Sequence, residues 1–148
     1  MNDFSSLQIL VAVTLGLAAS AEDLLRRTIS NWWSLAALLS GISLHTWHTG
    51  WRGLAAAVLG AVAGFAVFLV FYLLGGMGGG DIKLMAGFGS LVGISQLLVF
   101  AFWTALVGGV LAALVLAVNS FLRTANKRPS IPYAPAIAAG VCLALVSA

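Results

Sequence analysis

Apolar runs long enough to cross a lipid bilayer occupy most of this chain. The stretch from Leu54 to Leu74 contains no charged residue, and about 20 apolar residues in an α-helix span a hydrocarbon core about 30 Å thick. Because 61% of the 148 residues are hydrophobic, one small soluble globule could not bury them all. The sequence therefore predicts an integral membrane protein, with apolar runs over 6–22, 32–48, 54–76, 82–122 and 133–147.

The character of these runs predicts the fold class. They are continuous and rich in Leu, Ala, Val and Gly, without the alternation typical of a membrane β-strand. We therefore predict an all-α, polytopic membrane helix bundle. The run over 82–122 is too long for one crossing, and "GSLVGISQ" at 89–96 offers small and polar residues for a turn. Splitting it into a short helix, 82–91, and a long one, 95–122, gives about six transmembrane helices, the short one following a Gly-rich break.

The basic residues test this count, because Lys and Arg collect in cytoplasmic loops. With six crossings, six basic residues lie on one side of the membrane and only Arg52 lies on the other. With five crossings, three basic residues would lie on one side and four on the other, which gives no bias. We therefore predict both termini outside and the loops 23–31, 76–83 and 123–132 at the cytoplasmic face. One membrane domain uses residues 1–148. The six residues on one side are Arg26, Arg27, Lys83, Arg123, Lys127 and Arg128.

Several other readings of the sequence are disfavoured. The basic residues are scattered beside apolar runs, so no nucleic-acid partner is expected. Cys142 is the single cysteine, which leaves no CxxC pair. His45 and His48 could share a metal, but the interleaved tryptophans favour an aromatic belt at the outer interface. We predict no metal and no cofactor.

The N-terminal segment, whose "MNDFSSLQ" lacks Lys and Arg, is expected to stay attached as a membrane helix.

The stretch "GGMGGGDIKLM", residues 75–85, interrupts the apolar pattern. Five glycines in six positions surround Met77 and lead to Asp81. They break a helix and allow an extended peptide to approach the carboxylate. Neither GxxxxGK[ST] nor GxGxxG matches, which disfavours phosphate binding.

Asp23 and Asp81 are candidates for a catalytic pair. Only four acidic residues exist in the chain, and an ionisable group at bilayer depth costs about 2.5–3.5 kcal/mol. Two adjacent carboxylates suit aspartic-type hydrolysis, in which the ionised one takes a proton from water and the neutral one donates to the carbonyl oxygen. Charge placement alone equally allows simple ion pairs at the interface. Glu22 is expected to pair with Arg26, one helical turn on.

Three segments carry a resemblance to a known family. "GGGDIKLMAGFG" resembles the GxGD motif of the type IV prepilin peptidases, "EDLLRRTISNWW" resembles their first-helix motif, and "IPYAPAIAAG" is similar to their last helix. The resemblance implies a membrane aspartyl peptidase that removes the basic leader from prepilins or pilin-like proteins at the cytoplasmic face of a bacterial inner membrane. It implies Asp23 and Asp81 as the catalytic pair. Gly78, Gly80 and Lys83 would belong to the active-site loop or contact the substrate.

The chain departs from the family pattern at two places. Ser30 stands where proline is common, and the large insert with paired CxxC motifs is absent, so zinc binding and N-methylation are not implied. The length matches the short forms that serve tight-adherence pili. The expected partners are a prepilin substrate and membrane lipid, and the oligomeric state is left open. The alternatives are a small proton-coupled transporter, for which we find no inverted repeat, and a non-catalytic pilus-assembly subunit.

Overall fold

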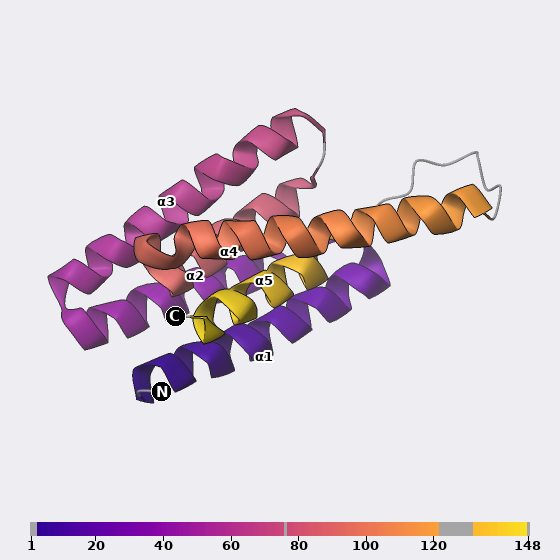
Figure 1. Ribbon diagram of the computed structural model, residues 1–148. Helices are drawn as coiled ribbons and strands as arrows, with labels where there is room; N and C mark the ends of the chain where they lie inside the picture. Colours follow the sequence, from indigo (N-terminus) through magenta and orange to yellow (C-terminus); the bar gives the residue numbers. More distant parts are fainter. Residues whose placement is uncertain (1–2, 76, 122–131, 148) are drawn as a thin grey trace.

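The chain folds into a bundle of α-helices. The computed structural model describes residues 3–75, 77–121 and 132–147. Within these ranges there is no β-strand (Figure 1), which confirms the predicted all-α class. The helices are α1 (Asp3–Arg26), α2 (Asn31–Thr49), α3 (Trp51–Leu73), α4 (Gly79–Phe121) and α5 (Ala134–Val146).

Helix α4 is two helices joined at Gly93. This residue has φ 72° and ψ 171°, a conformation that is essentially restricted to glycine. The chain reverses there, so that a short arm (79–92) and a long arm (94–121) run in opposite directions (Figure 1). The predicted break within 89–96 is confirmed, and the short arm follows the Gly-rich stretch as expected.

Several helices have the length and composition of membrane spans. These are Ser6–Arg26, Trp51–Leu73 and Gly79–Val118, and Ala134–Val146 is a shorter apolar helix. The chain is therefore a membrane protein, whereas the count of six crossings stays a prediction.

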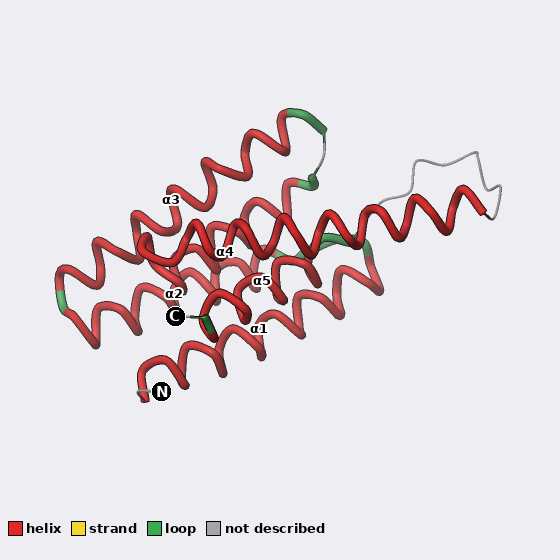
Figure 2. The backbone as a smooth tube through the Cα atoms, in the orientation of Figure 1, coloured by secondary structure: helices red, strands yellow, loops and turns green. Residues whose placement is uncertain are grey.

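Connections lie at the two ends of the bundle (Figure 2). The α1–α2 connection, the start of α4 and the start of α5 lie at one end, which we call the aspartate end because it holds Asp23 and Asp81. Both chain termini and the turn at Gly50 lie at the other end (Figure 1). Arg26, Arg27 and Lys83 are thus at the aspartate end and Arg52 is opposite. The remaining basic residues of the topology argument, Arg123, Lys127 and Arg128, lie outside the described residues.

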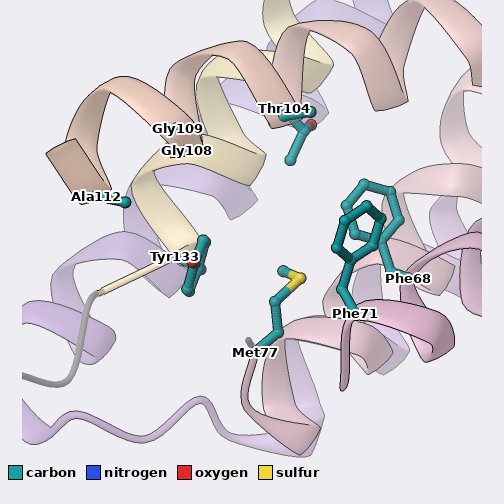
Figure 3. A pocket seen from close by; sticks show the side chains of 9 residues that line it. Phe68, Phe71, Met77, Thr104, Gly108, Gly109, Ala112 and Tyr133 are labelled. Carbon is teal, nitrogen blue, oxygen red and sulfur yellow. The ribbon is translucent and has the colours of Figure 1, made fainter. Parts of the chain in front are cut away.

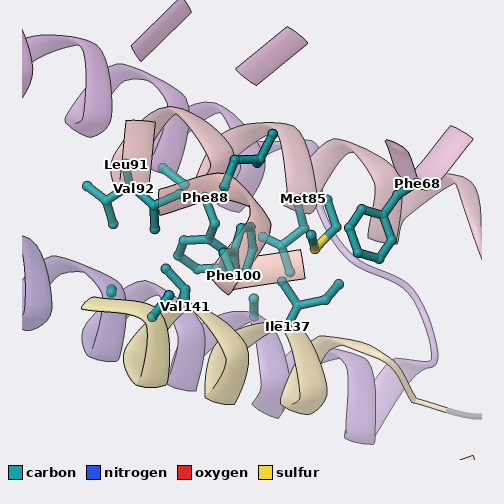
Figure 4. Packing of buried hydrophobic residues seen from close by; sticks show 14 of the residues in the cluster. Phe68, Met85, Phe88, Leu91, Val92, Phe100, Ile137 and Val141 are labelled. Atoms are coloured by element: carbon teal, nitrogen blue, oxygen red, sulfur yellow. The ribbon is translucent and has the colours of Figure 1, made fainter. Parts of the chain in front are cut away.

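The short arm of α4 is the centre of the bundle. Its side chains Leu84, Met85, Phe88 and Leu91 are fully buried, and they pack with Phe100, Ile137 and Val141 from the long arm and α5 (Figure 4). Such burial on all sides requires the neighbouring helices to come close.

Glycines permit this close approach. A Cβ placed on Gly60 of α3 would collide with the carbonyl oxygen of Gly89, and one on Gly87 would lie 2.6 Å from the carbonyl oxygen of Ser34 in α2. Small residues let membrane helices pack backbone against backbone. Gly60, Gly64 and Gly89 therefore serve the packing of α3 against the short arm of α4.

A polar cluster at the Gly93 reversal involves His45. The carbonyl oxygen of Leu91, in the last turn before the break, accepts a hydrogen bond from Gln8 Nε2 at 2.8 Å and lies 3.0 Å from His45 Nε2. Carbonyls at a helix end lack intrahelical donors and need other partners. His45 is half-buried and bonded inside the bundle, so its assignment to an aromatic belt was wrong. Trp47 and Trp51, in contrast, are exposed.

Candidate active site

Helix α1 ends one turn after Asp23, at Arg27, which has a left-handed backbone conformation. Arg27 has φ 57°, and its N–H donates to the carbonyl oxygen of Asp23 at 2.8 Å. A residue in this conformation ends a helix because the chain leaves the helical path there. Asp23 consequently lies in the last turn of α1, and Thr28, Ile29 and Ser30 cross toward α2.

Glu22 holds this crossing in place. Its carboxylate accepts hydrogen bonds from Ser30 N–H at 3.1 Å, from Ser30 Oγ at 2.7 Å and from Trp33 Nε1 at 2.7 Å. The expected attraction between Glu22 and Arg26 is present, and three hydrogen bonds to the α1–α2 connection and α2 add to it. A proline at position 30 would lack both donors that serine supplies, so serine fixes the connection by a different means.

The Gly-rich stretch presents Asp81 at the start of α4. Gly79 is the first helical residue, and Asp81, two residues later, accepts a hydrogen bond from the N–H of Gly78 at 3.0 Å through Oδ2. An acidic side chain that reaches back to the N–H before the helix is a common N-terminal cap. Asp81 is 8% exposed, so its carboxylate is held in a buried position.

Each glycine of the GxGD sequence has its own steric environment. A Cβ on Gly78 would lie 3.1 Å from Asp81 Oδ2, and one on Gly80 would lie 3.2 Å from Ile29 Cβ. The nearest contact for a Cβ on Gly79 is 3.9 Å, to Tyr72. Space is therefore tight at the two glycines of the motif and ordinary at the variable position between them.

Asp23 is held by the start of α5. Its Oδ2 accepts a hydrogen bond from the N–H of Ala134 at 3.1 Å, and the side chain is 7% exposed. Ala134 is the first residue of α5, and its N–H has no acceptor within its own helix. The "IPYAPAIAAG" segment thus contributes a backbone donor to the site, a role that the sequence analysis did not assign.

Asp23 and Asp81 line one cavity of about 330 Å³ at the aspartate end. The α1–α2 connection and the glycines form the rest of its wall, and Gly78 and Gly80 are both part of it. Two carboxylates that share a site resist ionising together, which favours one neutral and one charged partner. The arrangement can therefore supply a general acid and a general base to one substrate. The other lining residues are Arg27, Thr28, Ile29 and Gly79.

Lys83 lies in a different groove. Its Nζ donates to Asn31 Oδ1 at 2.9 Å, and both residues line a groove of about 580 Å³ between α2 and α4. Neither residue lines the aspartate cavity. Among the described residues there is also no group of three or more His, Cys, Asp or Glu side chains that could hold a metal ion.

The fold and the cavity define an all-α membrane protein with two buried aspartates at one end of its bundle. The sequence profile of the type IV leader peptidase family matches residues 10–113, which include both aspartates and the glycines between α3 and α4. The chain belongs to the type IV leader peptidase family.

Curated relatives agree with this assignment. The chain is 39% identical over 103 residues to a prepilin leader peptidase/N-methyltransferase of Bacillus subtilis, which covers 68% of this chain and 37% of that protein. It is 31% identical over 131 residues to the protein of the same name from Burkholderia pseudomallei, over 84% of this chain and 41% of that protein. The chain thus spans about two fifths of these relatives' length. No solved structure gives a significant match.

Proposed function

We propose that this chain is an aspartic-type membrane peptidase that removes the leader peptide from prepilins or pilin-like proteins. The observation that carries the proposal is the shared cavity of Asp23 and Asp81 in a member of the type IV leader peptidase family. The relatives named above are called peptidases, which gives no support to a proton-coupled transporter or a non-catalytic pilus-assembly subunit.

The two carboxylates would share the work of hydrolysis. The ionised one takes a proton from water while the water oxygen adds to the carbonyl carbon of the scissile bond, and the neutral one donates its proton to the carbonyl oxygen. Collapse of the tetrahedral diol then breaks the C–N bond. The carboxyl group that took a proton from water gives it to the departing nitrogen, and the other carboxylate takes back a proton from a diol hydroxyl. No metal is needed for these steps.

The backbone would orient both carboxylates for this reaction. Gly78 N–H holds Oδ2 of Asp81, and Ala134 N–H holds Oδ2 of Asp23. The other oxygen of each carboxylate would then act on water and substrate. Because residues 78–80 carry no side chains, an extended substrate backbone can approach Asp81 closely.

We place this reaction at the cytoplasmic face of the bacterial inner membrane. The support is the charge distribution, with Arg26, Arg27 and Lys83 at the aspartate end and Arg52 at the other. The proposed partners are the prepilin and the surrounding lipid. Methyl transfer, which the relatives' names include, is not proposed for this chain.

Co-expression tests the proposal. Candidate prepilins are produced with and without this chain, and the mass of the pilin N-terminus is measured. We expect loss of the leader with no added methyl group, and cleavage that persists in a metal chelator. Full-length prepilin for every candidate, with the chain inserted at normal levels, would contradict the proposal.

A further inference from the structure

A second cavity lies beside the aspartate site. It has a volume of about 210 Å³ and is bounded by α3, the long arm of α4 and the residues that precede α4 and α5 (Figure 3). Phe68, Phe71 and Met77 form one wall, and Gly108, Gly109 and Tyr133 face them. The lining is mostly apolar, with two hydroxyls, those of Thr104 and Tyr133, so the cavity suits a largely apolar occupant.

Both aspartates are connected to this cavity through the chain. Met77 is followed by Gly78, whose N–H binds Asp81, and Tyr133 is followed by Ala134, whose N–H binds Asp23. Two residues that line the cavity therefore directly precede, in the chain, the two residues whose N–H groups bind the carboxylates. An extended peptide advances about 3.3–3.6 Å per residue, so side chains within a few residues of a bond at the aspartates can reach the cavity.

Gly109 has no packing role of the kind seen at other helical glycines. A Cβ on Gly60 or Gly140 would meet a neighbouring backbone, whereas a Cβ on Gly109 would meet nothing within 4 Å. Glycine inside a helix costs about 0.8–1.0 kcal/mol relative to alanine. Gly109 is exposed and lines the cavity, so its missing side chain leaves the cavity open on this side.

We propose that this cavity is an apolar subsite that receives one large aliphatic or aromatic side chain of the substrate, within a few residues of the cleaved bond. An apolar cavity of about 150 Å³ is known to bind benzene, so this one has room for an aromatic ring. The inference rests on the proposed peptidase function and adds a determinant of specificity to it. A lipid chain in the same cavity is the competing occupant.

A size exchange between enzyme and substrate tests the subsite. The substrate is a prepilin that the wild-type chain processes, together with variants in which each large apolar residue near the cut is replaced in turn by alanine. We expect Gly109→Leu, which fills the cavity, to lower kcat/KM for the unaltered prepilin about tenfold or more, mainly through KM. Val110→Leu is the matched control, because Val110 is exposed and does not line the cavity.

The decisive result is the combination of the two changes. For one alanine-substituted prepilin, Gly109→Leu should cause little further loss, because the side chain that occupied the cavity is already gone. Losses that multiply for every prepilin variant, or a Gly109→Leu chain that matches Val110→Leu, would overturn the subsite and leave the cavity to lipid.

Crosslinking separates this inference from the peptidase proposal. A photoreactive phenylalanine at Phe71 in an Asp81→Asn chain should crosslink to the prepilin near its cleavage site, while the same group at Val110 should not. A crosslink without cleavage by the wild-type chain would retain the subsite and refute the peptidase. Cleavage without a crosslink at Phe71 would refute the subsite alone.

Discussion

Two backbone N–H groups, on Gly78 and Ala134, fix the orientation of the carboxylates at the residue scale. Gly78 precedes α4 and Ala134 begins α5, so neither N–H has an acceptor within its helix. Each donates to an aspartate instead. Hydrogen bonds between a backbone N–H and a charged acceptor are stronger than neutral ones. The role of each glycine near Asp81 therefore depends on which atoms a side chain at that position would contact.

Gly78 and Gly79 differ sharply in this respect. We expect Gly78→Ala to lower the rate of prepilin cleavage about tenfold, because its Cβ would press against Asp81 Oδ2 at 3.1 Å. Gly79→Ala should remain near the wild-type rate, since its Cβ has only an ordinary contact with Tyr72. Initial rates of leader removal by the two purified variants check this. Equal rates for both would refute the steric explanation of the motif.

Glu22 is expected to affect stability. Glu22→Ala removes the acceptor for Ser30 N–H, Ser30 Oγ and Trp33 Nε1, and a donor that loses its partner destabilises the fold. The apparent melting temperature in detergent should fall by several degrees, with Arg26→Ala as the control that removes only the attraction between the two charges. A larger fall for Arg26→Ala than for Glu22→Ala would contradict this assignment.

The short arm of α4 organises the molecule at the scale of elements. It packs against α2 and α3 through glycines and against α5 through large apolar side chains. Its first turn carries Asp81, and its last turn ends at the Gly93 reversal, where Gln8 and His45 bind the Leu91 carbonyl oxygen. The position of Asp81 therefore depends on contacts along the whole arm.

Gly93→Ala tests the importance of the reversal. Alanine at φ 72° is strained by about 1–3 kcal/mol, and its Cβ would lie 3.1 Å from the His45 ring. We expect a lower unfolding midpoint in denaturant and a smaller yield of inserted protein. Gly109→Ala is the matched control, because a Cβ there meets open space. Equal midpoints for the two variants would show that the left-handed conformation is unimportant.

The helices, the break in α4 and the aspartate pair could all be predicted from the sequence, because each leaves a side-chain signal. Apolar runs indicate helices, and charge is scarce enough that each carboxylate stands out. The Ala134 N–H that binds Asp23 and the Ser30 N–H that binds Glu22 could not be predicted, because backbone donors leave no such signal. The Ser30 Oγ and Trp33 Nε1 bonds to Glu22 depend on how the α1–α2 connection folds back. Lys83 lies outside the aspartate cavity because it is two residues from Asp81 on α4, and residues two apart on a helix point in different directions.

The whole molecule has two chemically different ends. Buried carboxylates and basic residues gather at the aspartate end, while both termini lie at the other. Exposed tryptophans occur at both ends, Trp32 at the aspartate end and Trp47 and Trp51 at the other. Tryptophan is typical of membrane interfaces, and Lys and Arg are typical of cytoplasmic loops. The basic residues at the aspartate end are the support for the cytoplasmic orientation that we propose.

Cysteine labelling in intact cells tests this orientation. In a Cys142→Ala background, cysteine at Thr49 should react with an impermeant thiol reagent, and cysteine at Thr28, at the exposed aspartate end, should react only after the cells are opened. Labelling of both positions in intact cells, or of Thr28 alone, would contradict the proposed topology.

The most direct test of the paired-aspartate mechanism is the rate of prepilin cleavage by Asp23→Asn and Asp81→Asn chains that insert at wild-type levels. Removal of a general acid or base typically costs about 10²–10⁴-fold in rate, so each variant should leave the prepilin unprocessed, while Glu22→Gln, next to Asp23, should keep most of the activity. A well-inserted Asp81→Asn chain that still removed the leader at a near wild-type rate would contradict the catalytic role of the pair.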